Sequence, residues 1–163
     1  MATTEAPDIE EQYISAGDSS NLRVEAERRS DADILIAAGW SNSRLGLALM
    51  RLQTKPDREG LHKVHEQAVM QVAKWGIDRP DSVASAVIAW WLKRICQKCN
   101  GVKFQRILNT PALSAKACNT CNGTGENILP YGYNGKRLAN WLDGAKAMAV
   151  QSIQSINKRM PKK

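Results

Sequence analysis

The sequence predicts a mainly α-helical protein with one small β-hairpin that carries a cluster of cysteines. Apolar residues recur at spacings of three and four through most of the chain, which is the pattern of one face of a helix. Residues 96–125 differ, because all four cysteines of the chain lie there in two C-x-x-C pairs around a strand-like stretch. We therefore expect a helical domain built around a four-cysteine site.

Charge is distributed unevenly along the chain. Residues 1–33 hold nine acidic and three basic residues and carry −6, whereas the whole chain carries +7, so the remaining 130 residues carry +13. A basic domain of this size favours a polyanionic partner, most often nucleic acid, over a membrane surface. A basic surface that serves only solubility is the alternative.

Residues 1–29 are acidic, rich in serine and poor in large apolar side chains. Such a segment buries too little surface to offset the entropy of ordering, so we expect an acidic disordered tail. Its start, MATTEAPDIEEQ, has no basic or apolar region of a signal peptide, and no apolar run reaches the about 20 residues of a membrane span. We expect a protein of a reducing cytoplasm with no membrane partner.

Residues 30–95 are expected to form a helical domain. Ser30 is placed to cap a helix that ends at Gly39, and Ser41 or Ser43 to cap a second helix. Helix, short turn and helix form the outline of a helix-turn-helix unit, although an ordinary αα-hairpin has the same pattern.

Two longer helices follow, one after Pro56 that stops near Gly76 and one that begins at Pro80. Each has an apolar face, and we expect both faces to be buried. Their residues are Leu61, Val64, Ala68, Val72 and Trp75 on the first, and Val83, Val87, Trp90, Trp91 and Ile95 on the second. The two tryptophans are expected to seat the cysteine segment on the helices, with base stacking as the alternative.

Residues 96–125 have the spacing of a zinc ribbon. The two pairs supply four thiolates, enough to close a tetrahedral zinc site, at Cys96, Cys99, Cys118 and Cys121. An Asn-Gly dipeptide follows each pair and tolerates the positive φ that turns backbone N–H groups toward a thiolate. Two disulfides or four inert thiols are the alternatives. His62 and His65 lie three apart on one helix, but four thiolates leave them no coordination position.

Residues 126–163 are expected to form a C-terminal basic helix and tail, with Asn134 as the cap. Its buried stripe is expected at Leu138, Trp141, Leu142, Ala145, Met148, Ala149 and Ile153. The opposite face carries Arg137, Asn140, Gln151, Gln154 and Lys158, types that hydrogen-bond base edges, although a solvated face is equally compatible.

Acidic residues are absent from the ribbon, and only Glu126 and Asp143 follow it, against eleven basic residues from Cys96 onward. We therefore predict a nucleic-acid-binding surface in this half of the chain, at Lys103, Arg106, Lys136, Arg137 and Asn140. No phosphate loop, nucleophile triad or carboxylate cluster is evident, and a four-thiolate site leaves no position for water, so we do not expect an enzyme.

The segment AAGWSNSRLGLALM, the C-x-x-C-x-G pair and the second pair, CNTCNGTG, occur in an order that resembles the late antitermination protein Q of lambda-type phages. The resemblance covers residues 31–125 and implies that Cys96, Cys99, Cys118 and Cys121 bind zinc. It also implies a factor of the host bacterial cytoplasm that binds double-stranded DNA near a late promoter and joins a paused RNA polymerase. Expected polymerase contacts are the β-flap region and the promoter-specificity factor, with cooperation by NusA and readthrough of terminators.

Two other functions fit parts of the sequence. CNTCNGTG also matches the zinc repeat of DnaJ-type chaperones, but those modules carry four repeats, and no His-Pro-Asp motif of a J-domain is present. A DNA-binding transcriptional regulator without a role in elongation is the second alternative.

Overall fold

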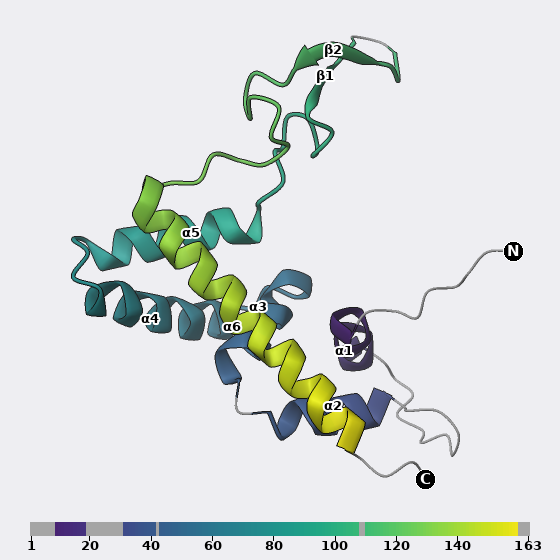
Figure 1. Cartoon of the computed structure of the whole chain (residues 1–163), viewed down its shortest axis with the longest axis vertical. Helices are drawn as coiled ribbons and strands as arrows, with labels where there is room; N and C mark the ends of the chain where they lie inside the picture. The colour runs from purple at the N-terminus through teal and green to yellow at the C-terminus, as the bar shows by residue number, and fades with distance from the viewer. Residues whose placement is uncertain (1–8, 19–30, 42, 108–109, 160–163) are drawn as a thin grey trace, which may run out of the picture. The chain divides into compact units, whose positions relative to one another are not determined.

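A computed structural model describes residues 9–18, 31–41, 43–107 and 110–159, and it is mainly helical (Figure 1). Both the helical class and the small antiparallel hairpin are as predicted. In these ranges the elements are α1 Ile9–Asp18, α2 Asp31–Gly39, α3 Arg44–Thr54, α4 Arg58–Lys74, α5 Pro80–Leu92, β1 Phe104–Arg106, β2 Leu113–Ala117 and α6 Gly132–Arg159. None of the described helices has the length and apolar character needed to cross a membrane.

The chain divides into two compact units. Unit 1 comprises Met1–Gln67 and Asn140–Lys163, and unit 2 comprises Ala68–Ala139. The division passes through α4 and α6, so it cuts across the segments 30–95 and 126–163 that the sequence suggested, whereas residues 96–125 lie wholly within unit 2. Each of these long helices therefore contributes to both units.

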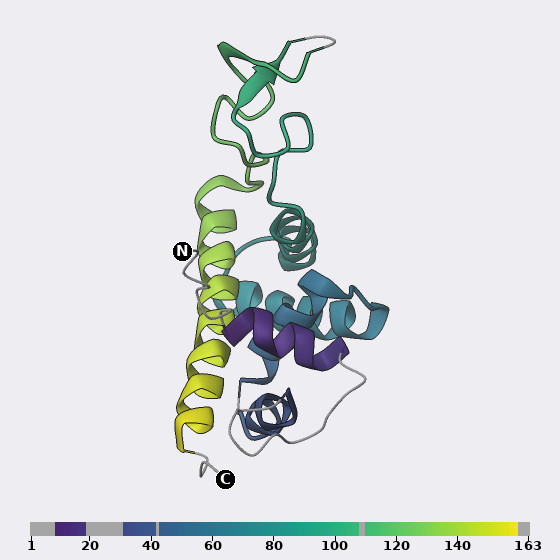
Figure 2. The same cartoon turned by 90° about the vertical axis from the view of Figure 1, so that its right-hand side faces the viewer.

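Unit 1 has an apolar core to which four helices contribute. Its buried members come from α1, α2, α3 and α6, and they are Tyr13, Ile34, Ala37, Ala38, Met50, Ala149 and Ile153. Figure 2 shows α1 in purple close to α2. Ala149 and Ile153 of α6 were predicted to be buried, whereas Met50 of α3 and the whole of α1 were not anticipated.

The expectation of a disordered acidic tail is wrong for residues 9–18, which form α1. Tyr13 is 3% exposed in the unit 1 core, and its hydroxyl accepts a hydrogen bond from Nε of Arg51 at 3.0 Å. Glu10 forms an ion pair with Lys146 of α6 at 2.5 Å. One aromatic residue and one ion pair attach this short helix, although polar and acidic residues are frequent in it. The rest of residues 1–29 lies outside the described ranges.

Of the five helix-start signals proposed from the sequence, Ser30 lies outside the described residues, and the starts of α3, α4 and α5 agree with theirs. Pro80 is the first residue of α5, and Ser43 occupies the N-cap position of α3 without a side-chain cap bond. Ahead of α4, Oδ1 of Asp57 accepts a hydrogen bond from the N–H of Gly60 at 2.6 Å. Asn134 is not the cap of α6, because the helix already begins at Gly132.

Three predicted core residues are exposed. Ile95 is 59% exposed because α5 ends at Leu92, so the helical period no longer applies to it. Met148 is 60% exposed at the edge of the buried stripe of α6, and Leu61 is exposed in the first turn of α4. The spacing of apolar residues therefore predicted burial well in the middle of each helix face and poorly at its edges and ends.

The close approach of α3 and α6 in unit 1 provides a test of this packing. A Cβ at Gly46 would fall on the carbonyl oxygen of Ala145 and on Cβ of Ala149. We expect Gly46→Ala to lower the free energy of unfolding by about 1–3 kcal/mol, the usual cost of overpacking. Chemical denaturation followed by circular dichroism measures the change.

Gly144→Ala is the matched control, because a Cβ at Gly144 meets nothing within 4 Å. Alanine is favoured over glycine in a helix by about 1 kcal/mol, so this variant should be slightly more stable than wild type. If both substitutions changed the free energy of unfolding equally, the close approach of α3 and α6 at Gly46 would be contradicted.

Candidate metal centre

The four cysteines meet at one buried point of the segment 96–125, which we call the cysteine hairpin. Their sulfur atoms all lie within 4.8 Å of one another, and Sγ of Cys99 lies 3.7 Å from Sγ of Cys121. A tetrahedral ion with sulfur ligands at about 2.3 Å would hold them about 3.8 Å apart. A disulfide needs about 2.05 Å, and all four thiols are free. The cluster could thus hold one metal ion.

The two C-x-x-C pairs fold in the same way, as two knuckles of residues 96–103 and 118–125. After the first pair, Asn100 and Gly101 have φ of 51° and 80°, and after the second, Asn122 and Gly123 have φ of 52° and 78°. Positive φ at each Asn-Gly was predicted from the sequence and is confirmed. These turns bring the backbone around each second cysteine.

Backbone hydrogen bonds cross between the knuckles in a reciprocal pattern. The N–H of Cys118 donates to the carbonyl of Lys103 at 2.8 Å, and the N–H of Cys96 donates to the carbonyl of Gly125 at 2.9 Å. The first cysteine of each knuckle is therefore bound to the last residue of the other.

Strand pairing continues the same relation outward. Phe104, after the first knuckle, is the antiparallel partner of Ala117, before the second. Ile95, before the first, forms a bridge with Glu126, after the second. The two knuckles are related by an approximate two-fold exchange that brings all four sulfur atoms together.

The backbone also stabilises thiolates. Burial raises the pKa of Cys121, but hydrogen bonds outweigh it, beginning with the N–H of Gly125 at 3.3 Å from Sγ, and lower that pKa to about 6. For Cys118, N–H groups of Cys121 and Thr120 lower the pKa. Burial raises the pKa of Cys99. Metals bind thiolates, so two of the four ligands are favoured in their binding form.

Asn127 attaches the end of the cysteine hairpin to the residues that precede it. Its Nδ2 donates to the carbonyls of Lys93 at 2.7 Å and Ile95 at 3.2 Å, and its N–H donates to Arg94. Its own carbonyl accepts from Nε1 of Trp90 at 2.7 Å. Trp90 thus seats the hairpin, as expected. Asn127 was not predicted, since only its place just after the second knuckle distinguishes it.

The predicted nucleic-acid-binding residues are all exposed, but the structure groups only some of them. Lys103 directly precedes β1 and Arg106 ends it, on the cysteine hairpin of unit 2. Lys136 and Arg137 also belong to unit 2, whereas Asn140 belongs to unit 1. Neither Lys136 nor Arg137 is at the helix N-terminus as expected, because α6 begins at Gly132.

Arg137 has a structural contact of its own. Its guanidinium lies over the ring of Trp75, 4.2 Å from the ring centre, which joins the first part of α6 to the end of α4 within unit 2. Removing this side chain therefore affects packing as well as charge.

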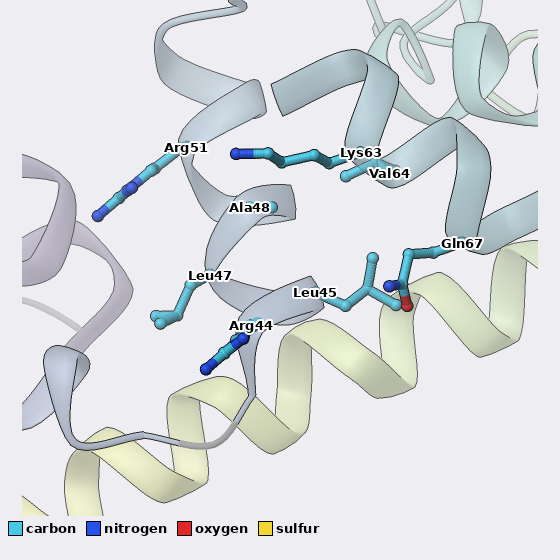
Figure 3. Close-up of a pocket in the computed structure, with 8 residues that line it drawn as sticks. All are labelled: Arg44, Leu45, Leu47, Ala48, Arg51, Lys63, Val64 and Gln67. Carbon is cyan, nitrogen blue, oxygen red and sulfur yellow. The ribbon is translucent and has the colours of Figure 1, made fainter. Parts of the chain in front are cut away.

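Unit 1 holds a basic hollow that sequence reasoning missed. Arg44 and Arg51 of α3 and Lys63 of α4 line a cavity of about 410 Å³ (Figure 3). Arg51 donates to Tyr13, and Lys63 pairs with Glu59 at 2.5 Å. Two of the three cations are thus already held by neighbours.

Comparison of the chain with protein-family models, with curated proteins and with solved structures finds no match.

The geometry predicts one metal ion per chain. We expect Cys96→Ser/Cys118→Ser to bind no metal, because it removes one ligand from each knuckle and leaves two. Elemental analysis of the purified proteins measures the metal content. The matched control, His62→Ala/His65→Ala, removes both histidines of the chain and should retain one metal ion per chain. A metal-free wild-type protein with a native fold would rule out the site.

Proposed function

We propose that the chain is a zinc-dependent nucleic-acid-binding protein that acts in transcription antitermination. The observation that carries the proposal is a cysteine hairpin with four converging sulfur atoms and a surface with basic but no acidic side chains. Its exposed cations are Lys98, Lys103, Arg106 and Lys116.

Zinc is the metal we propose because the donor set is four sulfur atoms at one point. Four thiolates in a tetrahedron suit zinc or an iron–sulfur centre, whereas calcium and magnesium require oxygen ligands. The sulfur spacing of 3.7 Å for Cys99 and Cys121 matches a single ion. Such a site holds the fold and leaves no position for a substrate.

Nucleic acid is the partner that the charge favours. From Cys96 onward the sequence has eleven basic and two acidic residues. Four of the basic residues, Lys103, Arg106, Lys136 and Arg137, are exposed in unit 2. Phosphate contacts by lysine and arginine supply most of the affinity of such proteins, largely independently of sequence. A chaperone module of the DnaJ type would need apolar clefts for unfolded chains rather than this charge.

The specific role rests on the sequence resemblance to the Q antitermination proteins. In this proposal the chain binds double-stranded DNA near a late promoter and joins a paused bacterial RNA polymerase through its β-flap region and promoter-specificity factor. With NusA, it then allows the polymerase to pass terminators. A DNA-binding regulator without a role in elongation is the second candidate.

Duplex binding is expected to depend on Lys136 and Arg137. Each lost phosphate contact lowers the slope of log K against log salt by about 0.9. Lys136→Ala/Arg137→Ala should therefore weaken binding to specific and scrambled duplexes alike, with a shallower slope. Fluorescence anisotropy at several salt concentrations measures it, with thermal unfolding followed by circular dichroism as a check on folding, because Arg137 also packs on Trp75.

Lys55→Ala/Arg58→Ala is the control, because it removes two exposed cations from the α3–α4 connection of unit 1. It should bind duplexes nearly as wild type does. If Lys136→Ala/Arg137→Ala loses affinity for the specific duplex alone, Arg137 reads a base. If it loses no affinity for either duplex, the duplex-binding surface lies elsewhere on the protein.

Antitermination is tested by run-off transcription from a phage late promoter with a promoter-proximal pause and a downstream terminator. Wild-type protein should increase the fraction of transcripts that pass the terminator, because it travels with the polymerase. Cys96→Ser/Cys118→Ser should give none of this increase. Unchanged termination with DNA-bound wild-type protein would favour the regulator without a role in elongation.

A further inference from the structure

The approximate two-fold relation of the knuckles reveals where they differ. The last residue of each knuckle is Gly125 in one and Lys103 in the other, and both have positive φ, 83° and 74°. The residue after it is Glu126 in one and Phe104 in the other. The same backbone position thus carries Gly-Glu once and Lys-Phe once.

Lys103 occupies a conformation that glycine adopts more easily. A side chain with a Cβ is strained in the left-handed region, and the equivalent position in the second knuckle has the unstrained residue. The frame of hydrogen bonds therefore does not need lysine here. Strain that a fold does not require suggests that the side chain serves a function.

Phe104 is the one phenylalanine of the chain, and it is 43% exposed. Its cross-strand partner is Ala117, whose methyl group is too small to cover the ring. Arg106 lies two residues along β1, beyond an irregularity in the strand register, and opposite Leu113; both are exposed. We call the exposed side chains of Lys103, Phe104, Arg106 and Leu113 the hairpin face.

A flat exposed ring, with exposed cations at neighbouring positions of the chain, provides the chemistry that binds an unpaired nucleobase. Base faces stack on aromatic rings while lysine and arginine neutralise the adjoining phosphates. In a duplex these faces are hidden against neighbouring pairs, so a single strand fits better. The absence of acids from residues 96–125 complements a polyanion rather than a basic or apolar partner.

We propose that the hairpin face binds single-stranded nucleic acid, with an unpaired base stacked on Phe104 and phosphates held by Lys103 and Arg106. This inference rests on the proposed nucleic-acid-binding function and assigns it a second ligand class besides duplex DNA. The shared chemistry is that of DNA and RNA strands, and the two are distinguished below.

The test uses the full, metal-loaded chain and fluorescein-labelled single-stranded DNA, single-stranded RNA and duplex DNA of one mixed sequence. Loss of one stacked base corresponds to about a 5-fold to 150-fold change in affinity. We expect Phe104→Ala to lose affinity in this range for at least one single strand and to stay within about twofold of wild type on duplex. Phe104→Trp, which keeps a stacking face, should restore binding.

A transplant variant controls for folding. Lys103→Gly/Phe104→Glu copies the residues of the second knuckle onto the equivalent positions of the first, so metal content should remain that of wild type. Its single-strand affinity should fall at least as far as that of Phe104→Ala. A loss on RNA alone or on DNA alone identifies the strand that the face prefers, and both results support the proposal.

Two results would overturn it. Wild-type binding to duplex but not to either single strand would refute the hairpin face while leaving the proposed duplex binding intact. The same holds if Phe104→Ala binds single strands as tightly as wild type does. Failure of wild type to bind any of the three probes would instead refute the nucleic-acid function as a whole.

Discussion

Convergence of four sulfur atoms is the constraint on which the cysteine hairpin depends. Within its described residues, the buried side chains are those of Cys96, Cys99, Cys118 and Cys121, while the side chains of β1 and β2 are largely exposed. Two short strands of this kind are not stable without further support. A metal ion bound by the cysteines would supply the cohesion that an apolar core supplies elsewhere, and would couple metal binding to folding.

The four sulfur atoms are positioned mainly by backbone hydrogen bonds within the cysteine hairpin. Each knuckle turns through an Asn-Gly at positive φ, and each first cysteine is tied to the last residue of the opposite knuckle. Because main-chain groups make these bonds, they constrain φ more than residue type. Lys103 can therefore replace the glycine of its counterpart at the cost of local strain, while the metal site keeps its geometry.

Sequence patterns predicted the features that local chemistry determines. The four ligands, the Asn-Gly turns, the start of α5 at Pro80 and the buried faces of the helices all depend on residues close in the chain. Features that depend on distant partners were missed or misplaced. Attachment of α1 requires Tyr13 to reach Arg51, and the seat of the hairpin requires Asn127 to reach Lys93. The division into two units follows from packing that no local pattern encodes.

Some residues of the cysteine hairpin hold its fold together, and others have side chains that are available to bind a ligand. Residues committed to the frame are the cysteines, the turn residues and Asn127, whose polar groups are used internally. The side chains of Lys103, Phe104 and Arg106 are exposed, although Lys103 and Phe104 supply backbone to the frame. A metal-centred frame that needs only backbone at these positions leaves their side chains open to selection for a ligand.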